Sequence, residues 1–245
     1  MATVVIGVAV QASVGFGFGF FVAPAALGVF HPAQAVTLLL LLALLLNALI
    51  LYSEGREREV DGRATTLLCA WAVPGIVGGA LVVRHLNAHV MQVAIGIGIV
   101  VAALLQARAD RGESAGESAP SADATLAGGG LCAGVLTSAT SLNGPAVALT
   151  YTRAGLRGHI YRDTGAAAFI VLALAGTAAL AGLAHTGRSL PHWPLLVALL
   201  PAVAVGHRLG AALFRRLDAE RHRRLVLVAA MVAGAVSVVA GIVSA

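Results

Sequence analysis

Apolar residues fill most of the chain in long uninterrupted runs, and polar residues gather in short segments between these runs. A run of about 20 apolar residues is long enough to cross the hydrocarbon core of a membrane as a helix. Two further apolar units, 2–30 and 126–152, are interrupted by glycine, proline and polar residues. The pattern predicts an all-α integral membrane protein, with spanning helices over 33–52, 64–83, 88–107, 164–184, 193–214 and 225–244.

The interruption in the second unit combines hydroxyl groups, a carboxamide and a Gly-Pro step. Asn143 or Gly144 is suited to cap a helix, and Pro145 then falls in the first turn, where its missing N–H costs nothing. We interpret the segment as two half-helices meeting at a polar tip inside the membrane, where open backbone must be buried by protein or line a wet cavity. The candidate residues are Thr137, Ser138, Thr140, Ser141, Asn143, Gly144 and Pro145.

The first unit contains a matching interruption. Glycines two positions apart do not follow a helical stripe, so they predict an open backbone with available N–H groups; a close-packing face is the alternative. Aligning Pro24 with Pro145 places the two broken segments in corresponding halves, which points to the binding site of a transporter. The candidates here are Gln11, Ser13, Gly15, Gly17, Gly19 and Pro24.

The two units begin two halves of nearly equal length. The segment 108–125 is rich in Ser, Ala, Gly and Glu, which is typical of a flexible linker. It separates a first transmembrane repeat, 1–107, from a second, 126–245. The later spans match at an offset of 131 residues, which aligns Gly75 and Gly79 with Gly206 and Gly210. These Gly-x-x-x-Gly patterns join either the two halves or two protomers.

Arginine distribution predicts how the spans are oriented. If both broken units are re-entrant hairpins, thirteen Arg lie on one side, in 56–63, 108–111, 153–162 and 215–224, and only Arg84 and Arg188 lie on the other. Full crossings by both units would place nine Arg on one side and six on the other, a weaker bias, so the positive-inside rule favours hairpins. Each half then has a hairpin plus three spans, and the two halves are inverted.

Composition excludes several function classes. Mean hydropathy is +0.91 and only 11% of residues are charged, so the net charge of +5 indicates orientation rather than nucleic-acid binding. No catalytic motif or metal-ligand spacing occurs, so we expect neither an enzyme nor a cofactor. Arg208 lies inside a predicted span and is a further candidate for substrate binding, although its side chain could instead reach the membrane surface.

The order of these blocks resembles the TauE/SafE family of sulfite and organosulfonate transporters. The resemblance rests on the segments 14–24, 142–145, 74–79 and 201–210 and covers nearly the whole chain. Here the first motif interleaves its glycines with Phe16 and Phe18, and the second motif has the single Gly144, whereas the family usually has adjacent or additional glycines. These departures from the family pattern bear on which substrate is bound and not on the class of protein.

The resemblance implies a secondary transporter for a small sulfur-containing anion, located in the cell membrane of a prokaryote. An anion channel that uses the same tips as a filter is the alternative, and a membrane enzyme or assembly factor is a further one. Expected partners are the anion and membrane lipid, with a proton or sodium as coupling ion and a homodimer left open. The exact substrate and the direction of transport are left open as well.

Overall fold

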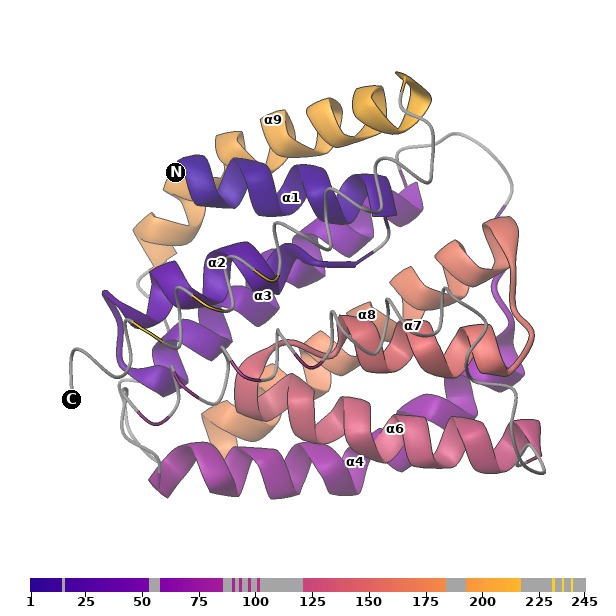
Figure 1. Cartoon of the computed structure of the whole chain (residues 1–245). Coiled ribbons are helices and arrows are strands. Elements are labelled where there is room, and N and C mark those ends of the chain that lie inside the picture. The colour runs from indigo at the N-terminus through magenta and orange to yellow at the C-terminus, as the bar shows by residue number, and fades with distance from the viewer. Residues whose placement is uncertain are drawn as a thin grey trace.

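The computed structural model describes residues 1–14, 16–52, 58–85, 121–183 and 193–216, with isolated positions at 90, 93, 97, 101, 231, 235 and 239. All regular structure in these ranges is helical (Figure 1). The helices are α1 (Ala2–Val14), α2 (Phe18–Leu27), α3 (Pro32–Tyr52), α4 (Gly62–His85), α6 (Ala122–Thr140), α7 (Gly144–Arg153), α8 (Gly158–Leu183) and α9 (Trp193–Arg216).

Helix length separates two classes of element. Four helices, α3, α4, α8 and α9, are long and apolar enough to cross a membrane. In contrast, α1 has 13 residues, and α2 and α7 have 10 each. At a rise of 1.5 Å per residue they extend only about 15–20 Å, against a hydrocarbon core of about 30 Å. The two predicted spans 88–107 and 225–244 lie outside the described ranges, apart from the isolated positions, which are helical.

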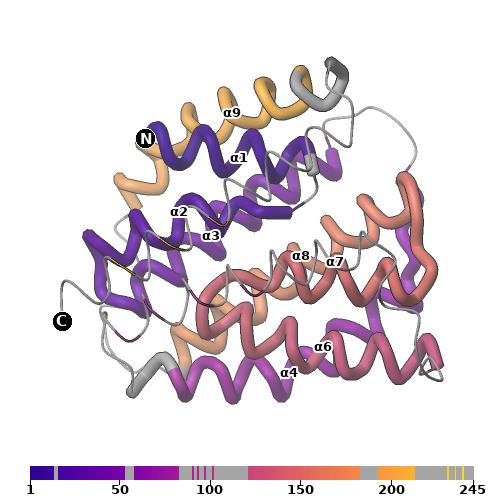
Figure 2. Tube along the Cα trace, viewed as in Figure 1, coloured from indigo at the N-terminus to yellow at the C-terminus, as the bar shows by residue number. Residues whose placement is uncertain are grey.

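The helices of the second half repeat those of the first in order, and two of the four described pairs, α2 with α7 and α4 with α9, also have equal lengths. Pro32 and Gly158, which begin α3 and α8, are 126 positions apart, as are the first residues of α2 and α7. The helices α4 and α9 have 24 residues each and are offset by 131 positions. The helices α4 and α9 therefore occupy corresponding places in the order of the described helices, which can be followed along the chain in Figure 2.

Each half packs its first helix against the last described helix of the other half. The helix α6 lies along α4, and α1 lies along α9 (Figure 1). Gly75 faces the carbonyl oxygen of Leu131, and Gly206 faces that of Val5, so a side chain at either glycine would collide with backbone. Leu131 and Val5 are themselves 126 positions apart. The same contact is thus made twice, and the glycine patterns join the two halves within one chain.

The outer faces of α4 and α9 carry large apolar side chains that suit contact with lipid rather than water. The buried core lies between α3 and α8, where Leu39, Leu46, Leu172 and Leu180 are almost fully enclosed. The exposed side chains are Trp71, Val73, Val77 and Leu81 on α4 and Val197, Leu200, Val205 and Leu209 on α9.

Two helix boundaries differ from the predicted ones. The helix α8 begins at Gly158, six residues before the expected start at 164, so Arg162 and Asp163 belong to the helix rather than to a basic loop. Asp163 tolerates burial because its carboxylate accepts a hydrogen bond from the backbone N–H of Glu59 at 3.0 Å. The helix α6 begins at Ala122, within the segment expected to be linker, and the Ser121 hydroxyl caps it by accepting a hydrogen bond from the Ala124 N–H. Residues 108–120 lie outside the described ranges.

Candidate functional site

The two predicted breaks are the points at which the chain reverses between a pair of helices. In the first half α1 ends at Val14 and α2 begins at Phe18, after Gly17 in a left-handed conformation with φ 113°. In the second half α6 ends at Thr140 and α7 begins at Gly144, after Ser141 at φ 58°. Glycine adopts this conformation freely, whereas a serine does so at a cost of about 1–2 kcal/mol. Both breaks therefore form tight tips between antiparallel arms.

The start of the first short helix differs from the prediction. We expected Pro24 to correspond to Pro145, but Pro24 lies in the interior of α2, at its seventh residue. Gly19, which we expected in open backbone, is already the second residue of α2, as Pro145 is of α7. The left-handed Gly17 starts α2, and no proline is needed in the first turn.

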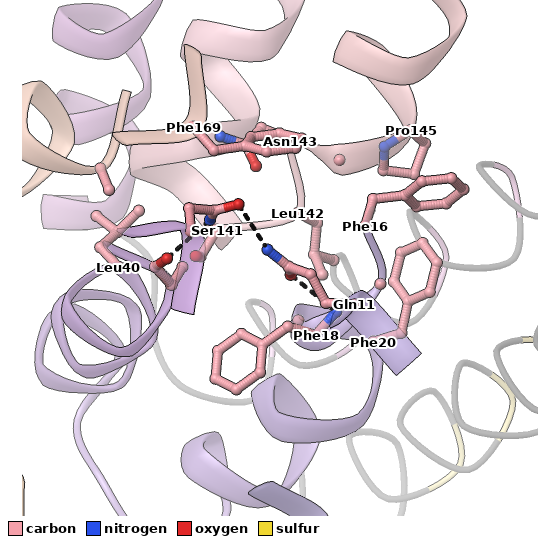
Figure 3. Close-up of a pocket in the computed structure, with 16 residues that line it drawn as sticks. Gln11, Phe16, Phe18, Phe20, Leu40, Ser141, Leu142, Asn143, Pro145 and Phe169 are labelled. Atoms are coloured by element: carbon pink, nitrogen blue, oxygen red, sulfur yellow. Dashed lines mark hydrogen bonds between the residues drawn. The ribbon is translucent and has the colours of Figure 1, made fainter. Parts of the chain in front are cut away.

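The two tips contact each other crosswise. Phe16 lies over the start of α7, where a Cβ atom added to Gly144 would be 2.9 Å from the Cβ of Phe16. Leu142 lies over the start of α2, where a Cβ added to Gly19 would be 2.7 Å from the Leu142 side chain. Figure 3 shows Phe16 beside Pro145 and Leu142 beside Phe18. An apolar side chain of each tip therefore covers the helix start of the other.

A cavity of about 30 Å³, which we call the central cavity, lies where the tips meet. It has room for one or two water-sized molecules. Most of its lining comes in pairs that are 126 positions apart, one member from each half. These pairs are Phe16 and Leu142, Gly17 and Asn143, Phe18 and Gly144, Gly19 and Pro145, Ala43 and Phe169, and Asn47 and Ala173, with Gln11, Phe20, Leu40 and Ser141 completing the lining.

A pair of carboxamides organises the first-half side of the cavity. The Gln11 side-chain oxygen accepts a hydrogen bond from the Phe18 backbone N–H at 3.3 Å, so Gln11 caps the start of α2. The Gln11 amide nitrogen donates to the Asn47 side-chain oxygen at 3.2 Å. Asn47 in turn donates to the carbonyl of Ala43 at 2.7 Å. Both carboxamides are buried, and both are held in fixed orientations by these bonds.

A different pair of polar side chains serves the second half. The Asn143 amide donates to the Thr137 hydroxyl oxygen at 2.7 Å, and that hydroxyl donates to the carbonyl of Ala133, also at 2.7 Å. Asn143 makes no side-chain bond to the N–H groups of α7, although it occupies the N-cap position. Pro145 has no N–H, so the donors of the first turn are the backbone N–H groups of Gly144 and Ala146.

The electrostatics of the cavity come from dipoles rather than from ionised groups. None of the described residues that line it carries an ionisable side chain. The first residues of both α2 and α7 line it, and a helix N-terminus carries a partial positive charge with N–H groups pointing outward. The arrangement suits an anion that binds through hydrogen bonds and can also leave.

The structure brings about half of the predicted site residues to this cavity. Gln11, Gly17, Gly19, Ser141, Asn143, Gly144 and Pro145 line it. Thr137 lies directly behind Asn143. Gly15 lies outside the described residues.

The other predicted residues do not line the cavity. The hydroxyls of Ser13 and Thr140 donate to carbonyl oxygens of their own helices, those of Val10 and Leu136, whereas the Ser138 hydroxyl donates to the carbonyl of Ile76 on α4 and joins two helices. Pro24 lies further along α2. Arg208 is exposed on α9, which suits the membrane-surface alternative.

Asn47 and Phe169 line the cavity without having been predicted. Asn47 is a lone carboxamide in an otherwise apolar run, and this could have marked it as a residue with a buried partner. Phe169 resembles any other aromatic residue of an apolar helix, so the sequence carried no signal for it.

Comparison with known proteins identifies one family for the chain. The family described as "Sulfite exporter TauE/SafE" matches residues 1–237, nearly the whole chain. No curated protein and no solved structure matches the chain at a significant level. The family and the four long apolar helices make this a multi-pass membrane protein of the transporter class. The chain belongs to the TauE/SafE family of sulfite exporters.

Proposed function

We propose that the chain is a secondary transporter that binds sulfite, or a sulfonate of similar size, in the central cavity between the two tips. The observation that carries the proposal is the convergence of two helix N-termini on one buried cavity without ionisable lining. An anion there would accept hydrogen bonds from backbone N–H groups of α7 and from polar side chains. On the α2 side the Gln11 oxygen already accepts a hydrogen bond from the Phe18 N–H. We propose that the anion either replaces Gln11 as the acceptor of this N–H or binds beside Gln11 as a second acceptor.

We further propose that the two halves are inverted and that α1–α2 and α6–α7 are re-entrant hairpins. Three of these four helices are too short to span, which supports hairpins over full crossings. Gly75 and Gly79 meet Leu131 and Val135 in the same order along α4 and α6, so these two helices run parallel. In Figure 1, α1 and α6 run in opposite directions, as do α3 and α8, which supports inversion.

The crossed tips favour alternating access over an open filter. Phe16 and Leu142 each come from one half and cover the helix start of the other, so a small rotation of one half would uncover both N-termini together. A channel would instead need a continuous path past the same residues. We place the protein in the cell membrane of a prokaryote, with the Arg-rich loops on the cytoplasmic side.

Reconstituted vesicles distinguish the two modes. When vesicles that contain the protein are loaded with unlabelled sulfite, the internal sulfite should accelerate uptake of ³⁵S-sulfite, because a carrier exchanges its substrate across the membrane. Sulfate, thiosulfate, taurine and sulfoacetate in the external medium should compete in proportion to their fit to the site. Repeating the uptake with an imposed proton or sodium gradient identifies the coupling ion. Uptake that rises without saturation and is not accelerated by internal sulfite would contradict a carrier and indicate a channel.

A further inference from the structure

A second, smaller cavity lies directly beside the central cavity. It has a volume of about 10 Å³, room for a single water. Phe16 and Phe169 line both cavities, and both are buried. The remaining lining comes from Val147, Ala148 and Tyr151 of α7 and from Tyr161, Arg162 and Gly165 of α8.

The residues around the second cavity differ from those at the equivalent positions of the first half. The position equivalent to Phe169 in the first half is Ala43, and the position equivalent to Arg162 is Val36, each 126 positions earlier. The correspondence between lining residues of the two halves, which holds for most of the central cavity, therefore does not extend into the second cavity. Loop residues Glu59 and Asp61 donate backbone hydrogen bonds to Asp163 and Thr164, at the same end of α8. The second cavity thus lies towards the 58–61 loop and the start of α8, on the side where the Arg distribution predicts the Arg-rich loops.

Arg162 introduces charge into this path. It is half-buried, and it contributes the only ionisable cation among the described residues that line the two cavities. Its guanidinium donates to the carbonyl oxygen of Ala12 at 3.1 Å, in the last turn of α1. This bond ties the start of α8 to the helix that leads into the first tip. A guanidinium offers five N–H donors in a planar fork, a geometry that matches the oxygens of a small oxyanion.

We propose that Arg162 forms a second anion-binding position between the central cavity and the Arg-rich side, separated from the central cavity by Phe16 and Phe169. This inference rests on the proposed function, because it gives the central anion its next contact. The small volume of the second cavity means that Phe16 or Phe169 must move when the anion passes. Arg162 sets the rate of passage on this side, whereas the central cavity sets equilibrium affinity.

The test compares sulfite flux with sulfite binding in matched charge variants. Arg162→Gln should lower ³⁵S-sulfite flux in vesicles at least tenfold, while the dissociation constant measured by calorimetry changes less than threefold. Arg162→Lys, which keeps the charge, should recover part of the flux. Arg157→Gln is the matched control, because Arg157 is exposed in the adjacent turn and its loss is the same change in net charge.

A second pair of variants tests the cavity without removing Arg162. Among the residues that the structure describes, a Cβ at Gly165 would meet only Phe169, at 4.0 Å, so a small side chain fits there. Gly165→Asp places a carboxylate in the second cavity and should slow sulfite flux at least tenfold relative to the nearly isosteric Gly165→Asn. Equal flux in the Asp and Asn variants, or equal flux in Arg162→Gln and Arg157→Gln, would overturn the inference.

Failure of this inference can be told apart from failure of the proposed function. If Asn143→Ala weakens binding while the Arg162 and Gly165 pairs show no difference in flux, the central site stands and the second position is wrong. If Asn143→Ala leaves binding unchanged, the central site is wrong. A loss of binding in Arg162→Gln as large as in Asn143→Ala would show that Arg162 only positions the tip, and would also overturn the inference.

Discussion

Asn143 and Thr137 are joined by a 2.7 Å hydrogen bond across the tip of the second hairpin. The Thr137 hydroxyl donates its proton to the carbonyl of Ala133, so its oxygen can only accept a hydrogen bond from Asn143. The nitrogen of the Asn143 carboxamide must therefore face Thr137, and this fixes the orientation of the whole side chain beside the cavity. Thr137 is fully buried and cannot exchange this partner for water.

The first prediction concerns this bond. Thr137→Val removes the acceptor while keeping the shape, so the Asn143 amide loses its partner and its fixed orientation. Sulfite affinity should fall by about 1–2 kcal/mol, the usual range for one hydrogen bond in a buried site. Thr137→Ser keeps the hydroxyl and should bind nearly as well as the wild type. Calorimetry on the purified protein measures both, and equal affinity in the Val and Ser variants would refute a role for the bond.

The second prediction separates backbone strain at Ser141 from the role of its hydroxyl. Ser141 is the only described non-glycine residue with a positive φ. Ser141→Gly relieves that conformation and should raise the unfolding free energy by up to about 1 kcal/mol. It should nevertheless weaken sulfite binding if the hydroxyl contacts the anion. Ser141→Ala loses the hydroxyl without relieving the strain. Unchanged sulfite binding in both variants would limit Ser141 to shaping the tip.

The third prediction concerns the glycines between the halves. Gly75→Ala and Gly206→Ala each drive a methyl group into a backbone carbonyl of the facing helix, and should destabilise the protein by about 1–3 kcal/mol. Gly78→Ala and Gly128→Ala are matched controls, because no atom of the described residues lies within 4 Å of either added Cβ. They should be neutral or stabilising, since alanine favours helix more than glycine. Thermal unfolding in detergent gives the comparison; the same loss at all four positions would mean that helix flexibility rather than packing is responsible.

Much of the architecture could be predicted from the sequence because lipid demands long apolar helices and because the chain repeats. The two interruptions, the Asn-Gly-Pro helix start and the Gly-x-x-x-Gly pairs each leave a local signature. The start of α2 could not be predicted in the same way. Pro24 is a stronger sequence signal than Gly17, but a left-handed glycine can start a helix without proline.

The site depended on contacts that local sequence does not encode. Ser13, Ser138 and Thr140 resemble Ser141 and Asn143 in chemistry, and only packing decides which of them face the cavity and which bond to helix carbonyls. The offset between the halves also changes from 126 to 131 residues after α3 and α8. Gln11 and Thr137, which are 126 positions apart, can therefore be recognised as equivalent positions only once the helices are aligned.

The fourth prediction concerns topology. In a variant in which Cys69 and Cys132 are replaced by Ala, a cysteine at Val29 should react with a membrane-impermeant maleimide added to intact cells. Val29 is 75% exposed, in the turn between α2 and α3. A cysteine at exposed Arg157 should react only after the membrane is permeabilised. Reaction of both positions in intact cells would contradict inverted hairpins, because these place the two turns on opposite sides.

The central claim is that the anion binds between the two tips, and the most direct measurement is sulfite binding to purified Asn143→Ala. Thr152→Val is the matched control, because Thr152 lies on the same short helix and is exposed, and its hydroxyl donates to the carbonyl of Ala148. We predict that Asn143→Ala weakens binding by about 1–3 kcal/mol, roughly 5- to 150-fold, while Thr152→Val binds like the wild type. Wild-type affinity in a folded Asn143→Ala protein would contradict the claim and place the site elsewhere.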